Sequence, residues 1–129
     1  METSFLTLGE VLRIHETQIN LFGGRDGVRD IGLLESAIEM PRAGMCGSYL
    51  HSDLFEMAAA YLFHIVQSHP FLDGNKRTGT VAAIVFLDIN DVAVEISNNE
   101  LTDLVISVAC GGIEKAAIAE FLRKHVITP

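Results

Sequence analysis

Residues 69–77 read His-Pro-Phe-Leu-Asp-Gly-Asn-Lys-Arg, and this polar stretch lies between two long apolar segments. The segment from about 53 to 68 is apolar at nearly every helical position apart from one narrow polar stripe, and the middle of the segment from about 74 to 90 is apolar all round. Helices of this kind are buried at the centre of a domain. Pro70 disfavours a helical conformation at His69 and ends the first helix there. We therefore predict a rigid junction between two central helices.

Capping signals predict two helices before this pair. Thr7 begins a capping box for a first helix that the glycine pair 23–24 would end. Asp30 can cap a short second helix. The segment 41–52 follows with a proline, two glycines and two serines but few periodic apolar positions, and it is predicted to be an exposed loop or flap.

Two further helices are predicted after the central pair. Residues 91–96 alternate in character and favour a short extended segment. Ser97 opens another capping box for a helix to about Cys110, and a last amphipathic helix covers about 113–125. The fold class is therefore all-α, with about six helices around two central ones, and the whole chain 1–129 has the size of a single domain.

Composition and charge narrow the functional classes. Hydrophobic residues alone make up 49% of the chain, before its 11 glycines are counted with them, whereas soluble domains have about 45–50% for the two groups together. This excess predicts well-buried helices and an apolar patch for a partner. The net charge of −8 argues against binding of nucleic acid by this chain alone and against anionic membranes. The adjacent cations Lys76 and Arg77 are a local exception.

Targeting signals and cysteines indicate the compartment. The N-terminus has no basic segment followed by an apolar one, and the longest apolar run, residues 81–87, is far shorter than the ~20 residues of a membrane span. Cys46 and Cys110 are widely separated and form no C-x-x-C motif, so we interpret them as small buried or partly buried side chains in a reducing compartment. These features predict a cytoplasmic protein.

The start of the second central helix has the chemistry of a phosphate site. Gly74 and Asn75 open this helix, where unpaired N–H groups and the positive end of the helix dipole meet, and Gly74 has no side chain to keep an anion from the backbone. Lys76 and Arg77 lie in the first turn, where the dipole disfavours cations, so an anionic ligand explains their presence. Arg77 can hold phosphate oxygens with two hydrogen bonds. Lys76 as a solvated surface lysine remains an alternative.

Two residues beside this anion site can supply the chemistry. Asp73 can hold Mg²⁺ that bridges to phosphates, although Asp is also a favoured N-cap. His69 can accept the proton of an incoming hydroxyl at neutral pH. The reaction class is phosphoryl or nucleotidyl transfer from a nucleoside triphosphate. The other histidines have no metal-ligand spacing and are interpreted as solvated or packed side chains: His15, His51, His64 and His125. For His64, which lies on the polar stripe of the first central helix, a supporting role near the site is the less favoured alternative.

Residues 69–78, His-Pro-Phe-Leu-Asp-Gly-Asn-Lys-Arg-Thr, resemble the signature of Fic/Doc proteins, and specifically of the death-on-curing (Doc) toxins. The similarity continues outside the signature. Residues 27–30, Gly-Val-Arg-Asp, followed by 32–37, Gly-Leu-Leu-Glu-Ser-Ala, resemble the N-terminal Doc block. Residues 53–60 resemble the segment that leads into the central helix. Together the resemblance covers roughly residues 7–124.

The resemblance implies a compact Fic-like helical domain and an active site. His69 would be the general base for a protein hydroxyl, Asp73 would carry Mg²⁺, and Gly74 and Asn75 would form an anion hole for ATP. Arg77 would hold one of its phosphates. Fic enzymes that transfer AMP have glycine at the position of Lys76, whereas Doc proteins have lysine, which implies transfer of the γ-phosphate. The implied activity is that of a protein kinase-like toxin that phosphorylates elongation factor Tu and arrests translation.

The resemblance also bears on regulation. Fic proteins that inhibit themselves carry a Ser/Thr-x-x-x-Glu-Gly/Asn helix, and the nearest match here, Ser52 to Glu56, is followed by Met57. An antitoxin protein from the same operon is therefore the implied inhibitor, and the flap at 41–51 would hold the target. Three alternatives remain from the residues themselves: AMP transfer to a protein hydroxyl, a non-catalytic module that sequesters a partner, and, least favoured by the charge, a DNA-binding regulator.

Overall fold

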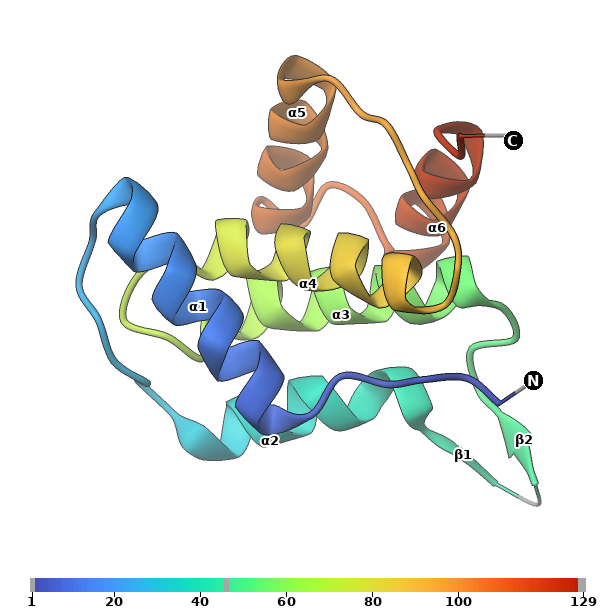
Figure 1. The fold of residues 1–129 in the computed structure, drawn as a ribbon, viewed down its shortest axis with the longest axis horizontal. Helices are drawn as coiled ribbons and strands as arrows, with labels where there is room; N and C mark the ends of the chain where they lie inside the picture. The colour runs from blue at the N-terminus through green and yellow to red at the C-terminus, as the bar shows by residue number, and fades with distance from the viewer. Residues whose placement is uncertain (1, 46, 128–129) are drawn as a thin grey trace.

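A computed structural model of the chain describes residues 2–45 and 47–127, and within them it has six α-helices (Figure 1). The predicted all-α class is confirmed. The helices are α1 (Leu8–Phe22), α2 (Ile31–Glu39), α3 (Leu54–Ser68), α4 (Asn75–Ile89), α5 (Asn98–Ala109) and α6 (Lys115–Lys124).

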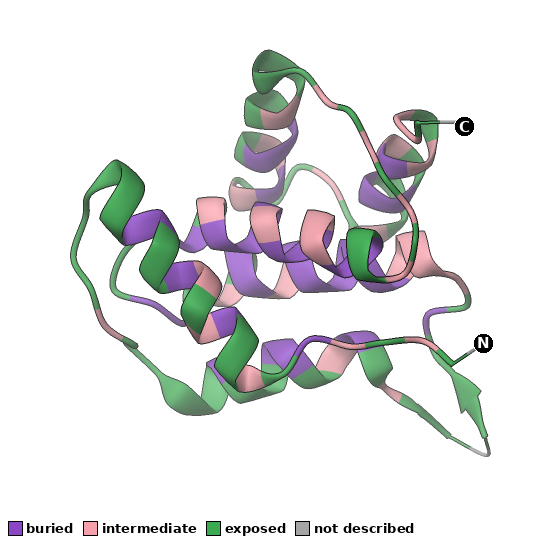
Figure 2. Ribbon diagram, viewed as in Figure 1, coloured by how far each residue is buried: buried purple, intermediate pink, exposed green. Residues whose placement is uncertain are grey.

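Helices α3 and α4 form the centre of the molecule, as the sequence predicted. Their side chains are buried on most of their circumference, and α3 contains an uninterrupted buried run from Met57 to Leu62 (Figure 2). Gly79 in α4 allows the close approach of the two helices, because a Cβ atom there would lie 3.0 Å from the Val66 side chain and 3.3 Å from the Leu62 carbonyl oxygen. The connection between α3 and α4 is therefore fixed at both ends by the core.

The remaining helices cover this pair on different sides. Helix α1 packs on α4, α2 packs on α3, and α6 packs on α3 from the side opposite to α2 (Figure 1). The predicted caps are present: Thr7 forms the full capping box of α1, and the side chains of Asp30, Asp53 and Ser97 each accept a hydrogen bond from the first turn of their helix. Helix positions therefore follow from local chemistry together with the apolar faces.

Two segments between the helices have more structure than a loop. A 3₁₀ turn, η1 (Met40–Arg42), contains the proline that ends α2, and it leads into an exposed antiparallel hairpin of β1 (Gly44–Met45) and β2 (Ser48–Tyr49). The hairpin occupies the predicted flap. In the predicted extended segment 91–96, Val94 forms an isolated antiparallel bridge with Val126.

Cys110 differs from its prediction. It caps the C-terminal end of α5 and is exposed, because its position falls on the outer face of the last turn. Cys46 lies outside the described residues. None of the helices in the described part of the chain is both long and apolar enough to cross a membrane.

Candidate active site

The junction between α3 and α4 is tied to the segment before α2 by backbone hydrogen bonds. The N–H groups of Arg29 and Asp30 both donate to the Pro70 carbonyl oxygen, at 2.7 and 3.1 Å, and Leu72 N–H donates to the Gly27 carbonyl at 3.0 Å. Phe71 is 1% exposed and anchors the loop in the core, whereas Leu72 is exposed. Residues 27–30 therefore hold the junction in place through backbone hydrogen bonds.

His69 ends α3 in the left-handed conformation, with φ 50° and ψ 56°. Pro70 was expected to move this residue out of the helical conformation and to end α3 there, and it does. The Arg29 side chain holds the last carbonyl groups of α3: its Nε donates to the His69 oxygen at 2.6 Å and its Nη2 to the Ser68 oxygen at 2.8 Å. A left-handed histidine is uncommon and costs about 1–2 kcal/mol, so the bonds from Arg29 help to maintain it.

Asn75 fixes the inside of the junction. Its side chain is buried, its Oδ1 accepts from Phe71 N–H at 2.9 Å, and its Nδ2 donates to the Phe71 carbonyl at 3.0 Å. These two bonds define the orientation of the amide, so it is an N–H that faces Nδ1 of His69 at 3.4 Å. The side chain is used by the loop itself, and only the backbone N–H of Asn75 is left for an anion.

Asp73 presents an exposed carboxylate beside this loop. Its Oδ1 accepts from Gly74 N–H at 2.9 Å and its Oδ2 from Arg25 N–H at 3.2 Å. These bonds from Arg25 and Gly74 hold the pKa of Asp73 below its ordinary value, with a smaller contribution from nearby arginines. Gly24 makes room for the carboxylate, because a Cβ atom there would lie 2.8 Å from Oδ2. Asp73 is ionised at neutral pH.

The alternative interpretation of Asp73 as the cap of α4 is wrong. The N-cap is Gly74, whose φ is 76°, and no side chain caps the helix. The carboxylate accepts hydrogen bonds from the N–H of Gly74 and from the N–H of Arg25, in the loop before α2. The left-handed conformation of Gly74 turns the chain so that this carboxylate cannot cap the helix. The unshared lone pairs of the carboxylate are therefore left for a cation.

The first turn of α4 carries unpaired donors. Its first intrahelical bond runs from Thr78 N–H to the Gly74 carbonyl, so the N–H groups of Asn75, Lys76 and Arg77 lie before it. Arg77 Nη2 donates weakly to the Gly23 carbonyl at 3.3 Å, and its guanidinium lies 5.1 Å from the centre of the Phe22 ring. Its Nε is buried without a hydrogen-bond partner. Lys76 is exposed.

A pocket of about 430 Å³ joins these groups. It contains every site residue that the sequence predicted, and one exposed leucine completes its wall: His69, Leu72, Asp73, Gly74, Asn75, Lys76 and Arg77. A proton acceptor, an ionised carboxylate, two cations and free backbone N–H groups thus face one cavity. This arrangement can bind a polyphosphate with its metal ion beside a hydroxyl group.

Comparison with known proteins gives the same family as the motif. The model of the Fic/DOC family matches residues 5–87. The chain is 36% identical over 115 residues to "Protein kinase doc" of Escherichia phage P1, which covers 89% of this chain and 90% of that protein. It is 39% identical over 100 residues to "Toxin Doc" of Mycolicibacterium smegmatis, covering 76% and 77% of the two chains.

The chain belongs to the Fic/DOC family. The match to the family model includes α1 to α3, the whole junction and most of α4, whereas α5 and α6 lie beyond the matched residues.

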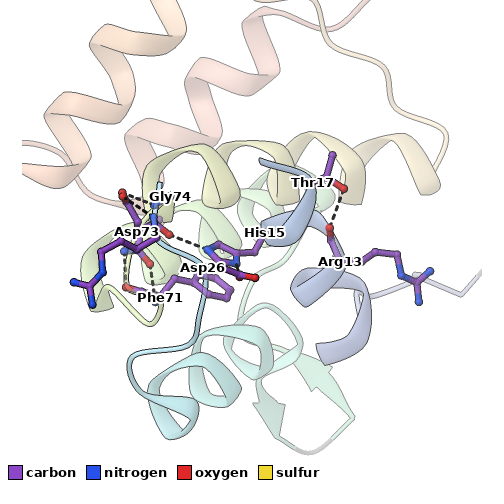
Figure 3. A network of polar contacts seen from close by, with 9 residues as sticks. Arg13, His15, Thr17, Asp26, Phe71, Asp73 and Gly74 are labelled. Atoms are coloured by element: carbon purple, nitrogen blue, oxygen red, sulfur yellow. Dashed lines mark hydrogen bonds and ion pairs between the residues drawn. The ribbon is translucent and has the colours of Figure 1, made fainter. Parts of the chain in front are cut away.

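One residue near this Fic/DOC motif was missed as a site residue from sequence. His15 of α1 is 2% exposed and stacks on Phe71, with the ring centres 3.8 Å apart and the planes at 4° (Figure 3). Its Nε2 lies 2.8 Å from the Asp73 carbonyl oxygen. A carbonyl only accepts, so Nε2 carries the hydrogen and Nδ1 faces Asp26 at 3.9 Å. The signal available in the sequence was a histidine on an apolar helix face, with Val11 and Ile19.

Arg29 was the second site residue without a sequence assignment. Its guanidinium contacts the end of α3, and the neighbouring Asp30 caps α2. The other histidines are packed away from the pocket: His125 pairs with Glu100 at 2.9 Å, and His51 and His64 both face Lys115.

Proposed function

We propose that this protein is the toxin of a toxin–antitoxin module and a kinase-like transferase that moves the γ-phosphate of ATP to a hydroxyl of elongation factor Tu, arresting translation in the cytoplasm. The observation that carries the proposal is the pocket in which His69, Asp73, Lys76 and Arg77 meet the first turn of α4. The names of the two relatives, "Protein kinase doc" and "Toxin Doc", support the kinase and toxin parts of the proposal. Residues 1–129 are proposed to act as one Fic/Doc domain.

His69 is proposed as the general base. The Asn75 amide N–H faces Nδ1, so in the neutral ring the proton is on Nε2 and the lone pair is on Nδ1. The contact of 3.4 Å is longer than a normal hydrogen bond, and it competes only weakly for that lone pair. His69 ends α3 in the left-handed conformation and lines the pocket.

The residues fit a nucleotide with Mg²⁺. Asp73 offers an ionised carboxylate. Mg²⁺ is usually held by one or two carboxylates together with waters and substrate phosphates, so one aspartate is sufficient on the protein side. Within the described residues no group of three or more His, Cys, Asp or Glu side chains could hold a metal. Bound Mg²⁺ would neutralise charge on the phosphates.

Hydrogen-bond donors without partners support the proposed binding of the ATP phosphates at the start of α4. The buried Nε of Arg77 has no hydrogen bond, and the N–H groups of the first turn of α4 precede the helical hydrogen-bond ladder. We propose that Arg77 and these N–H groups hold the phosphates and that Gly74 leaves the backbone accessible to them. Lys76 fills space and adds charge at the same helix end. It is proposed to place the γ-phosphate, and not the α-phosphate, next to the acceptor.

An apolar groove beside the active site supports the antitoxin as partner. It has a volume of about 570 Å³, lies between α1, α4 and α5, and reaches Lys76 and Arg77. Its wall includes Phe22 and Ile106, which are 62% and 51% exposed. A bound antitoxin segment would cover these side chains and lie next to the phosphate-binding cations. Such a surface is the apolar patch for a partner that the composition predicted.

Labelled ATP tests the reaction. The purified protein is incubated with elongation factor Tu and ATP that carries label on either the α- or the γ-phosphate. We expect label on the factor only from the γ position, and none with the His69→Ala variant. Label from the α position alone would instead establish AMP transfer.

A growth assay separates catalysis from sequestration. Expression of the wild-type protein is expected to stop growth, and expression of His69→Ala at the same level is not. Full growth inhibition by His69→Ala would mean that the protein acts by binding a partner and not by catalysis.

A further inference from the structure

A second cluster of polar groups lies outside the active site, around the first residue of α6. Lys115 Nζ lies 3.0 Å from Nε2 of His64 on α3 and 3.3 Å from Nε2 of His51, which precedes α3. The ring of Phe63 is on the same side, with its centre 5.9 Å from Nζ. Among the described residues no carboxylate lies within ion-pair distance of this ammonium group. Lys115 is thus a half-buried lysine with two imidazoles and no counter-ion.

The hydrogen bonds define the protonation states of the two imidazoles. An ammonium group only donates, so both Nε2 atoms accept and both rings are neutral, with hydrogen on Nδ1. Burial, the Lys115 charge and His51 together lower the pKa of His64 to about 4. Burial and Lys115 also lower the pKa of His51, although Glu56 and the Met40 carbonyl oppose them. Both rings therefore stay neutral at physiological pH.

The protonation equilibrium of Lys115 is shifted toward the neutral amine. Acceptance by two imidazoles favours the ammonium, but burial disfavours it, and the pKa of Lys115 is lowered by that burial. A neutral amine has two N–H groups and one lone pair. When the two N–H groups donate to His51 and His64, the lone pair occupies the remaining position, away from both rings.

A groove provides access to this amine. It has a volume of about 430 Å³ and runs along α6, where Ala116 and Ala119 leave room beside the lysine. Leu50, Glu56 and Arg123 also line it, although no Glu56 oxygen is within ion-pair distance of Nζ. A small reagent can reach Nζ there without entering the core or the candidate active site.

We propose that Lys115 is an acylation site that accepts small acyl groups from acyl phosphates. The Nζ lone pair forms a bond to the acyl carbon, the carbon–oxygen bond to phosphate breaks, and phosphate leaves with the electron pair. The proton lost from nitrogen goes to water, since the neighbouring imidazoles are poor bases at this position. The proposal is independent of the ATP-dependent activity and uses none of its residues.

Acylation would alter the cluster. The product amide has no charge and one N–H, so it can keep a hydrogen bond to only one of the two imidazoles. Lys115 at the start of α6 would then lose its contact either with His64 on α3 or with His51 after the hairpin. The modification thus changes a contact that joins three parts of the fold.

The chain contains its own control for a test. It has three lysines, and Lys124 lies exposed on the same helix as Lys115. The folded protein is treated with acetyl phosphate, and acetylation at each lysine is followed by mass spectrometry of peptides. Because each unit by which a pKa falls raises the free-amine fraction up to tenfold, we expect Lys115 to react at least about threefold faster than Lys124. In denaturing urea the two rates should become equal.

Two variants sharpen the result. His64→Leu removes one acceptor that favours the ammonium form and keeps the site apolar, so it is expected to raise the Lys115 rate further, whereas the Lys124 rate should not change; circular dichroism verifies that the variant is folded. Lys115→Arg should remove the fast-reacting site. The proposal is overturned if Lys115 in the folded wild-type protein reacts no faster than Lys124, or if the preference persists in urea. Acetyl coenzyme A in a parallel arm distinguishes a thioester donor from an acyl phosphate; equal rates at the two lysines with both donors would also overturn the proposal.

Discussion

Two regions of the molecule hold their histidines in opposite ways. At the active site, His15 donates to the Asp73 carbonyl, and the ring of His69 faces the side-chain amide of Asn75. The partners are a carbonyl and an amide, which do not titrate. The positions of these two histidines therefore do not depend on a charged partner. The charged groups of the site, Asp73, Lys76 and Arg77, stay available for a ligand.

In the Lys115 cluster the partner is a titratable cation. His51 and His64 are positioned by one ammonium group, which requires both rings to be neutral. Gain of a proton by either ring removes its contact with the lysine, and acylation of the lysine leaves an N–H for only one of the two rings. The active site therefore keeps its geometry when the pH changes, whereas the Lys115 cluster responds to pH and to chemical modification.

The largest effect is expected at His69. The change His69→Gly removes the proposed base, and we expect transfer to fall by about 100-fold or more. The same change relieves a left-handed backbone, so the free energy of unfolding should rise by roughly 0.5–1 kcal/mol. Urea unfolding and the labelled-ATP assay measure the two quantities. His69→Ala, which keeps a Cβ atom, should lose activity without this gain. A Gly variant that is both active and less stable would contradict the assignment.

A smaller effect is expected from His15→Phe. The new ring can still stack on Phe71, but the donor to the Asp73 carbonyl is lost, at an expected cost of about 2 kcal/mol in unfolding free energy for an unpaired buried group. The affinity for Mn²⁺ used in place of Mg²⁺ should also fall, because Asp73 is less well positioned. His15→Gln keeps a donor and serves as the matched variant. Equal metal affinity in the Phe variant and wild type would show that His15 is only a core side chain.

The pH dependence of stability should reveal His64. Its pKa is lowered to about 4 in the folded chain from 6.5, so between these values the unfolded chain binds a proton that the folded chain does not. Stability therefore falls as the pH is lowered through this window, by on the order of 1–2 kcal/mol once water access to the ring is considered. Urea unfolding at several pH values measures this slope.

His64→Gln retains an acceptor for Lys115 and cannot titrate. Its unfolding free energy should have a shallower slope between about pH 6.5 and about pH 4. An unchanged slope would assign the pH dependence to other groups.

The smallest effect is expected from Arg29→Ala. Two exposed hydrogen bonds to the Ser68 and His69 carbonyls are lost, at an expected cost of about 1 kcal/mol. Activity should fall more than this stability loss explains, because the left-handed turn is less well held. Arg29→Lys keeps the charge but lacks the planar guanidinium that reaches both carbonyls, and it should recover little activity. Full activity in the Lys variant would mean that charge alone matters at this position.

The sequence allowed prediction of features that depend on neighbours in the chain. Caps such as Thr7 and Asp53, the buried pair α3 and α4, and the grouping of the motif residues around one helix start follow from spacing and polarity alone. The hairpin of β1 and β2 did not, because two-residue exposed strands leave no alternating pattern.

Long-range contacts were also beyond the sequence. His15 meets a carbonyl 58 residues away and Arg29 meets one 40 residues away, and such contacts leave no periodic signal. The left-handed state of His69 follows from the Arg29 contact and was missed for the same reason. The exposure of Asp73 could be predicted because its side chain is charged. The hydrogen bonds that its carboxylate accepts from the N–H groups of Arg25 and Gly74 could not.

The position of α6 has a consequence for biosynthesis. Helix α3 is covered on one side by α6, which is synthesised later in the chain. A nascent chain without residues 115–124 cannot bury this face of α3, and domains generally fold as units. We therefore expect the active-site junction to become ordered only once α6 has been made and can pack. Ribosome-bound chains stalled before residue 115 should be cleaved by protease between 69 and 77, and resistance there would show earlier folding.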